Sequence, residues 1–131
     1  MLPKFTVDPT DPANITFTDT PLHKIWPQLE ILVEKGLVRS IGVSNCAVPM
    51  LVDLLTYAKI KPVMNQVELH PYLSQKDFVD FARNKLGVQF TAFSPIGAPG
   101  FEHKSASIKE LNLITDPTIV EIGTKYGRSP A

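Results

Sequence analysis

The chain has 131 residues, enough for one modest domain, and its 44% hydrophobic and 20% charged residues are close to the average for globular proteins. Thirteen basic and thirteen acidic residues balance without a cluster of one sign, which argues against binding to nucleic acid or to an anionic membrane. Cys46 is the only cysteine, so an internal disulfide is excluded; no apolar run could span a bilayer, and residues 1–20 lack the apolar core of a secretory signal. We therefore expect a cytoplasmic location.

The first predicted elements are a loop and a helix. Residues 1–20 contain several prolines and few periodic apolar residues, so they are predicted to be loop. From Thr20 onward apolar residues recur with helical spacing, with Pro21 at the start of the helix and Gly36 at its end. Pro27 lies inside this pattern, where it would either kink the helix or begin it.

Strands and helices then alternate. A short β-branched run over 37–45 predicts the first strand, and an apolar stripe over 48–58 predicts a helix. Residues 63–71 predict the second strand. Ser74 is expected to cap a helix over 75–85, which has one apolar face.

The last third of the chain holds one more strand and one more helix. Gly87 is expected to end the preceding helix, and residues 87–97 predict the third strand. A long loop to about Thr115 follows. Asp116 is expected to cap the final helix, and Gly127 to end it.

This order predicts an α/β fold with a parallel sheet. The strand starts near Val38, Val63 and Val88 are about 25 residues apart, a spacing typical of repeated βα units, which would extend over 21–127. Strands that alternate with helices pair in parallel because each helix is the crossover connection. Residues 128–131 predict the start of a further helix, from which we expect a truncated chain.

Polar residues gather where each predicted strand would leave the sheet. The first strand ends in Ser44 and Asn45, the second carries Gln66 and Glu68, and the third ends in residues 93–97. In parallel α/β folds the carboxyl ends of the strands form the functional face. These motifs therefore predict a site at that edge of the sheet.

Three segments, GLVRSIGVSN (36–45), NQVELHPYL (65–73) and TAFSPIG (91–97), resemble the aldo-keto reductases, in particular the aldose and xylose reductase branch. The resemblance runs from about Trp26 to Ala131. It implies a (β/α)8 TIM barrel, of which this chain would supply about half, including strands five to seven. Residues 1–131 would then form a partial NADP-dependent oxidoreductase domain. The implied activity is hydride transfer from NADPH to the carbonyl of an aldehyde, ketone or sugar.

The resemblance also implies which residues hold the cofactor. Ser44, Asn45 and Gln66 match the residues that bind the nicotinamide carboxamide, a group with one acceptor and two donors that hydroxyl and amide side chains complement. Phe93 stands where the family usually has a stacking tyrosine, so the ring is kept and the hydroxyl is lost. The residues matching the loop along the cofactor pyrophosphate are Ser94, Pro95, Ile96 and Gly97.

Strand periodicity divides the polar residues of the second strand between two faces. Gln66 and Glu68 share one face and Asn65 and Val67 the other. In a barrel the first face would be the interior, where Glu68 needs a cationic or donor partner. Residues 63–71 offer no obvious one.

The family's catalytic tetrad of Asp, Tyr, Lys and His comes from the first four strands, and nothing in this sequence matches it. No catalytic residue is assigned, and we predict that the isolated chain has no reductase activity. No metal site is predicted either, because Glu68 and His70 have no third ligand nearby.

Two other functions are compatible with parts of the sequence. One is a non-catalytic module that pairs the open edges of its sheet with a partner chain. The other is an unrelated parallel α/β enzyme such as an aldolase-type barrel. That enzyme would need a Schiff-base lysine at a strand end, and none of the three predicted strand ends carries one.

Overall fold

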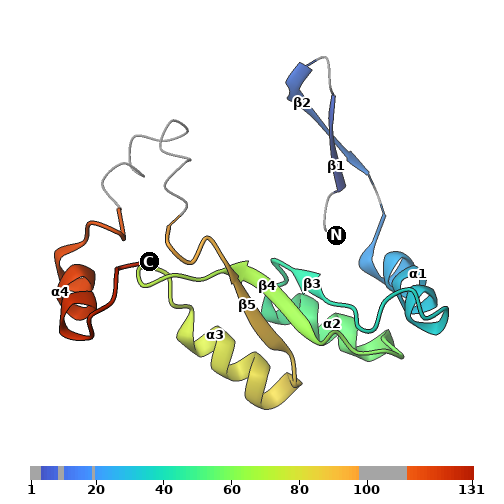
Figure 1. Cartoon of the computed structure of the whole chain (residues 1–131). Helices are drawn as coiled ribbons and strands as arrows, with labels where there is room; N and C mark the ends of the chain where they lie inside the picture. The colour runs from blue at the N-terminus through green and yellow to red at the C-terminus, as the bar shows by residue number, and fades with distance from the viewer. Residues whose placement is uncertain (1–3, 9–10, 19, 98–111) are drawn as a thin grey trace.

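The computed structural model describes the backbone of residues 4–8, 11–18, 20–97 and 112–131, and the side chains of residues 20–97 and 112–131. After an initial pair of strands, helices and strands alternate along the chain (Figure 1). They are β1 (Lys4–Asp8), β2 (Asp11–Thr18), α1 (Leu22–Glu34), β3 (Val43–Ser44), α2 (Val48–Tyr57), β4 (Met64–Glu68), α3 (Lys76–Phe81), the π-helical turn η1 (Ala82–Leu86), β5 (Gln89–Phe93) and α4 (Pro117–Lys125).

The central feature is a three-stranded sheet in the order β3-β4-β5, and both strand pairs are parallel. The register aligns Val43 with Asn65 and Asn65 with Phe90, while Ser44 aligns with Gln66 and Gln66 with Thr91. The parallel sheet predicted from the alternation of strands and helices is confirmed. In Figure 1, helix α1 lies to the right of this sheet and helix α4 to its left.

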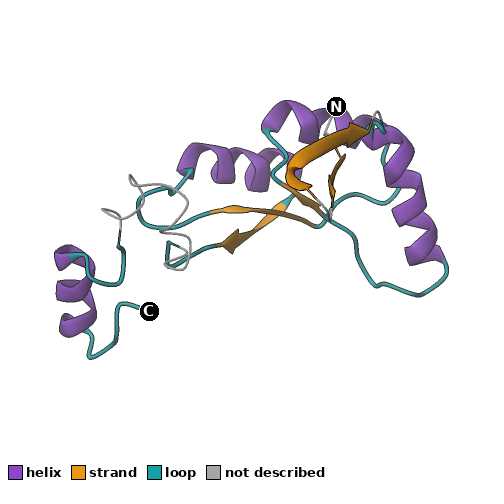
Figure 2. Cartoon of the chain, turned by 90° about the horizontal axis from the view of Figure 1, so that it is seen from above, coloured by secondary structure: helices purple, strands orange, loops and turns teal. Residues whose placement is uncertain are grey.

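One face of the sheet is covered by α2 and α3, which lie along the same side of the strands (Figure 2). The core there is built on the buried side chains of Cys46, Leu51 and Ala82, against which Phe78 and Phe90 pack. The rings of Phe78 and Phe90 meet edge to face with their centroids 5.0 Å apart. This contact pins α3 to β5.

A second core lies where α1 meets α2. Trp26, Ile41 and Leu54 are its buried residues. The Trp26 indole N–H donates a hydrogen bond to the Ile60 carbonyl at 3.0 Å, and the Glu30 carboxylate accepts from the backbone N–H groups of Lys59 and Ile60. Helix α1 therefore fixes the loop that leads into β4.

The opposite face of the sheet is open in the described part of the chain. Along β4, Asn65 and Val67 are buried while Met64 and Gln66 are exposed. The predicted division of this strand between two faces is therefore confirmed. Gln66 lies on the open face, where a barrel would have its interior.

Residues 1–20 differ from the predicted loop, because their described part forms an antiparallel pair of strands, β1 and β2. Apolar residues alternate with polar ones in both strands, and the register pairs Phe5 with Phe17 and Val7 with Ile15. The high proline content obscured this alternation. A two-stranded ribbon has only edge strands, which tolerate a proline such as Pro12.

The first strand of the parallel sheet is shorter than predicted. Only Val43 and Ser44 have strand geometry, although pairing with β4 begins at the Ile41 carbonyl, which accepts from the Val63 N–H at 3.0 Å. At Gly42 a β-carbon would lie 2.7 Å from the Met64 carbonyl oxygen, so the two strands approach too closely there for any other residue.

Helix starts were predicted less well than helix ends. Pro21 precedes α1 as its N-cap residue, Ser74 caps nothing, and α3 begins after Gln75, which has a φ of 45°. Asp116 does cap α4, accepting from the N–H groups of Thr118 at 2.9 Å and Ile119 at 3.1 Å. The three predicted terminal glycines all have positive φ: Gly36, Gly87 and Gly127.

Residues 128–131, predicted to begin a helix, are not helical in this structure. The Ser-Pro pair at 129–130 has the residue types of a helix start but no helical geometry in this structure.

Candidate functional site

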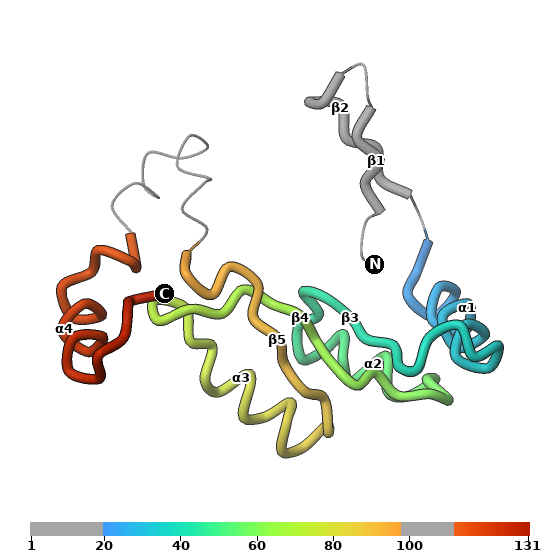
Figure 3. Tube along the Cα trace, viewed as in Figure 1, coloured from blue at the N-terminus to red at the C-terminus, as the bar shows by residue number. Residues whose placement is uncertain are grey.

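The carboxyl ends of β3, β4 and β5 lie next to one another at one edge of the sheet (Figure 3). The Gln66 carbonyl accepts two hydrogen bonds from the end of β3, one from the Ser44 hydroxyl at 2.9 Å and one from the Asn45 N–H at 3.0 Å. The Leu69 N–H donates to the Phe93 carbonyl at 3.4 Å. The structure thus brings Ser44, Asn45 and Gln66 together, and it places Phe93 at the end of the neighbouring strand.

A cavity of about 280 Å³ opens at this edge. Asn45 and Phe93, both predicted site residues, line it together with Cys46, Glu68, Gln75 and Phe78. Ser44 and Gln66 are not among its lining residues, and neither are Ser94, Pro95, Ile96 and Gly97. The last four residues follow β5 as a separate tight turn, closed by a hydrogen bond from the Gly97 N–H to the Ser94 carbonyl at 2.9 Å.

Besides Gln75, two residues other than glycine have positive φ in the described part of the chain, and both directly follow strands. Asn45 has a φ of 54° and Ser94 a φ of 51°, both in the left-handed region that residues other than glycine rarely adopt. Each residue comes directly after a strand of the site, β3 or β5. Such conformations cost about 1–3 kcal/mol each and tend to cluster at functional sites.

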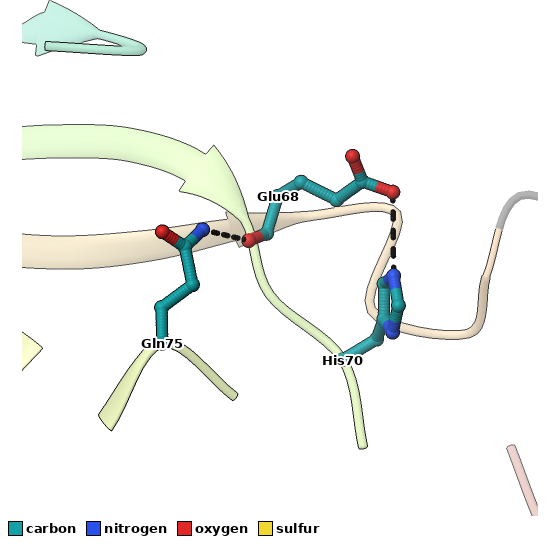
Figure 4. A network of polar contacts seen from close by, with 3 residues as sticks. All are labelled: Glu68, His70 and Gln75. Carbon is teal, nitrogen blue, oxygen red and sulfur yellow. Dashed lines mark hydrogen bonds and ion pairs between the residues drawn. The ribbon is translucent and has the colours of Figure 1, made fainter. Parts of the chain in front are cut away.

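Glu68 and His70 form a polar pair at the end of β4 (Figure 4). The Glu68 Oε1 lies 3.3 Å from the His70 Nε2, and the Gln75 side-chain amide donates to the Glu68 carbonyl at 2.8 Å. The expectation that residues 63–71 offer Glu68 no partner is therefore wrong. Residues two positions apart in an extended segment share a face, which puts the imidazole beside the carboxylate, and the chain then turns, with His70 bridging to Leu73.

Asn65 was not predicted as a site residue, yet it is bonded directly to the end of β3. Its side chain is fully buried, its Oδ1 accepts from the Cys46 N–H at 3.3 Å, and its Nδ2 donates to the Cys46 carbonyl at 2.7 Å. The signal in the sequence was an amide on the face of the strand that it shares with Val67. The partner could not be read from the sequence, because Cys46 is 19 positions away.

Three groups in this region have shifted pKa values for identifiable reasons. Burial raises the pKa of the Cys46 thiol, which keeps it protonated and unreactive. The Tyr72 hydroxyl donates to the Asp116 carboxylate, which raises the pKa of Tyr72 and lowers that of Asp116. This bond connects the segment after β4 to the start of α4.

Two further properties of the described residues bear on function. Within residues 20–97 and 112–131, no group of three or more histidine, cysteine, aspartate or glutamate side chains is arranged to hold a metal ion. Among the helices of the described ranges, none combines the length and the hydropathy that crossing a membrane requires.

Comparison with known proteins supports the resemblance found in the sequence. A family model described as "Aldo/keto reductase family" matches residues 1–131. The chain is 43% identical over 120 residues to a probable NAD(P)H-dependent D-xylose reductase of Aspergillus clavatus, and 44% identical over 110 residues to aldose reductase B of Dictyostelium discoideum. These alignments cover 90% and 84% of this chain but 36% and 32% of the two relatives. The chain therefore spans about a third of the length of the curated relatives it matches.

Solved structures give the same result. The structure of aldose reductase from Giardia lamblia matches with a TM-score of 0.78 and 39% identity, over 96% of this chain and 38% of that one. The aldose reductase from Schistosoma japonicum matches with a TM-score of 0.76 and 28% identity, over 96% of this chain and 36% of that one. The predicted fold class is confirmed: the three parallel strands and their helices are part of a (β/α)8 barrel.

Proposed function

This chain belongs to the aldo/keto reductase family, and from that membership we propose that its strand ends form the nicotinamide-binding part of an NADPH-dependent reductase. The reaction would convert an aldehyde, a ketone or the carbonyl of a sugar into an alcohol. Relatives named as NAD(P)H-dependent D-xylose reductases support a nicotinamide cofactor and a small carbonyl substrate. A single cysteine, buried as a free thiol, suits a protein of the reducing cytosol.

The observation that carries the proposal is the convergence of Ser44 and Asn45 on Gln66. Both residues bond to the Gln66 carbonyl, so the end of β3 is fixed against β4. All three residues are exposed at the carboxyl ends of the strands, and the Ser44 hydroxyl, which donates to the Gln66 carbonyl, can still accept a hydrogen bond. A hydroxyl and two amides complement a carboxamide, which offers one acceptor and two donors, so the donor set fits this group.

Phe93 adds an apolar surface to this polar cluster. Its side chain is half-buried and lines the same cavity as Asn45. An aromatic face suits stacking on a nicotinamide ring. The turn over Ser94–Gly97, directly after β5, would contact the pyrophosphate through the N–H groups of Ser94 and Ile96, because Pro95 has no N–H and that of Gly97 donates to the Ser94 carbonyl.

The cofactor, when bound, supplies the hydride that reduces the carbonyl carbon. The residues of this chain would fix the orientation of the ring through its carboxamide, and the orientation decides which hydride faces the substrate. None of the three tyrosines lines the cavity: Tyr72 donates to Asp116, the Tyr57 hydroxyl is buried, and Tyr126 follows α4. We therefore assign no proton donor to this chain and expect cofactor binding without turnover.

The test is a titration of the 131-residue chain with NADPH, with binding monitored by fluorescence. Gln66→Leu should weaken binding about tenfold, because hydrogen bonds of the carboxamide are lost. The matched control is Gln89→Leu, which removes an exposed amide from β5 at the opposite end of the strands. Purified chain with NADPH and an aldehyde should show no oxidation of the cofactor. Absence of NADPH binding, or equal effects of the two variants, would refute the proposal.

A second candidate, an interaction module, is favoured by the edges of the sheet. Within the described residues β3 and β5 each pair only with β4, so their outer backbone groups are available to another strand. Sedimentation of the chain over a range of concentrations separates the two functions. Association without NADPH binding would support the module.

A further inference from the structure

Asn65 occupies a buried position, where a polar side chain without hydrogen-bond partners would lower the stability of the fold. It is fully buried on the helix-covered face of β4, and its neighbours in the register are Val43 on one side and Phe90 on the other. Both neighbours pack against the core of Cys46, Leu51 and Ala82. An amide buried there is stable only if its hydrogen bonds are satisfied within the protein.

Both bonds of the Asn65 side chain go to one residue. The Cys46 N–H donates to Oδ1 and the Cys46 carbonyl accepts from Nδ2. The side chain thus replaces the backbone partner that Cys46 lacks after β3 has left the sheet at Ser44. Cys46 is also fixed by its own side chain, which is buried in the core with Leu51 and Ala82.

This pairing fixes the conformation of Asn45, which lies between two anchored residues. Ser44 is held by β4 through the Gln66 carbonyl, and Cys46 is held by Asn65. With both neighbours fixed, Asn45 must span the turn, and it does so with a φ of 54°. The strain at Asn45 is therefore maintained by its surroundings.

We propose that Asn65 is a positioning residue for the cofactor site, acting through the backbone of Cys46 to hold Asn45 in its left-handed conformation beside the cavity. The inference rests on the proposed function for its ligand, a nicotinamide carboxamide, and it adds a residue that does not itself touch the ligand. Asn65 and Gln66, at adjacent positions of β4, then have different roles. Gln66 faces the open side of the sheet, and Asn65 fixes the turn after β3 from the buried side.

The test compares Asn65→Leu with Val88→Ala in the 131-residue chain. Leucine keeps the branched heavy-atom skeleton of asparagine, although it is larger, and removes both bonds to Cys46. Val88 is equally buried but precedes β5 at the far end of the strands, so Val88→Ala lowers stability without touching the turn. For each variant the dissociation constant for NADPH, the denaturant midpoint and the hydrogen-exchange rates of the Asn45 and Cys46 amides are measured. If Asn65→Leu does not fold, Asn65→Ser, which keeps a short polar group, is measured in its place.

Asn65→Leu should raise the dissociation constant at least tenfold and accelerate exchange at Asn45 and Cys46 more than at the β4 and β5 amides. Val88→Ala should leave the dissociation constant within twofold and accelerate exchange without a local maximum at the turn. Equal effects of the two variants, or uniform exchange in Asn65→Leu, would overturn the inference and leave the proposed function standing. Failure of the unchanged chain to bind NADPH would instead overturn the proposed function, and with it the cofactor part of the inference.

Discussion

Buried polar side chains anchor a loop at each end of the parallel strands, and the two loops differ in what they present. Before β4, Trp26 and Glu30 of α1 bond to the backbone of Lys59 and Ile60. After β3, Asn65 bonds to both backbone groups of Cys46. Each anchor crosses a long stretch of sequence, and each satisfies backbone groups that no strand pairs.

The loop before β4 has ordinary backbone geometry and leads to a buried proline, Pro62. The loop after β3 carries Asn45 with positive φ, an exposed amide and a cavity wall. In a barrel fold the amino ends of the strands serve stability and the carboxyl ends serve function. A buried polar side chain bonded to loop backbone therefore supports stability at the amino ends and the proposed site at the carboxyl ends. Variants at the two ends should separate these two effects.

The largest expected effect is on stability, at the amino ends of the strands. Trp26→Ala should lower the free energy of unfolding by about 3–5 kcal/mol, because it removes the largest fully buried side chain and its bond to Ile60. Trp26→Phe keeps a ring and should lose only about 1 kcal/mol with the hydrogen bond. Denaturant unfolding measures both. A Trp26→Ala chain with unchanged unfolding would show that α1 is not part of the core.

Glu30 should come next, again with an effect on stability. Glu30→Leu leaves two backbone N–H groups without an acceptor and should cost about 2–3 kcal/mol, whereas Glu30→Gln keeps an oxygen acceptor and should cost less. Glu34→Gln, an exposed position on the same helix, is the control. If Glu30→Leu and Glu34→Gln unfold at the same denaturant concentration, the anchoring role assigned to this carboxylate is wrong.

The sequence predicted which residues of β4 lie on each face better than it predicted the hydrogen bonds that anchor the loops. The alternation along β4 follows from residue types alone, so the placement of Gln66 and Asn65 on opposite faces could be predicted. The bond between Asn65 and Cys46 could not, because it depends on how β3 leaves the sheet. Glu68 has its partner at shorter range: His70 is two positions away, on the same face of an extended segment, so this contact could have been predicted from the spacing.

The predicted boundaries failed where local signals competed with pairing. The β-branched run at 37–45 predicted a long strand, but only Val43 and Ser44 have strand geometry. Prolines predicted a loop over residues 1–20, but alternating apolar residues pair in β1 and β2. In both cases the deciding factor was the neighbouring strand, which a local pattern does not contain.

At the carboxyl ends the expected effect is smaller and concerns binding. Ser44→Ala removes a hydroxyl that donates to the Gln66 carbonyl and should weaken NADPH binding by about 0.5–1.5 kcal/mol. The unfolding free energy should change little, because Ser44 is exposed. Ser40→Ala, also exposed and outside the strand, is the control for titration and unfolding. If Ser44→Ala lowers stability but leaves NADPH binding unchanged, the carboxyl ends of the strands serve stability as the amino ends do, and the comparison fails.

The smallest effect should come from the pair Tyr72 and Asp116, which is exposed and joins the segment after β4 to α4. The hydrogen bond lowers the pKa of Asp116 below its ordinary 3.8 and raises that of Tyr72 above its ordinary 10.0. Asp116 therefore stabilises the fold above pH 3.8, an effect lost as the pH falls through its folded pKa. Tyr72 stabilises the fold below pH 10.0, an effect lost as the pH rises through its folded pKa.

Between these limits Tyr72→Phe should unfold at a slightly lower denaturant concentration than the unchanged chain, and the difference should vanish in more acidic solution as Asp116 is protonated. The expected difference is small because water and salt screen an exposed pair. Tyr126→Phe removes another exposed hydroxyl, one without this carboxylate partner, and should show no such pH dependence. A difference for Tyr72→Phe that persists unchanged below the folded pKa of Asp116 would mean that the ring of Tyr72, and not its bond to Asp116, holds α4 in place.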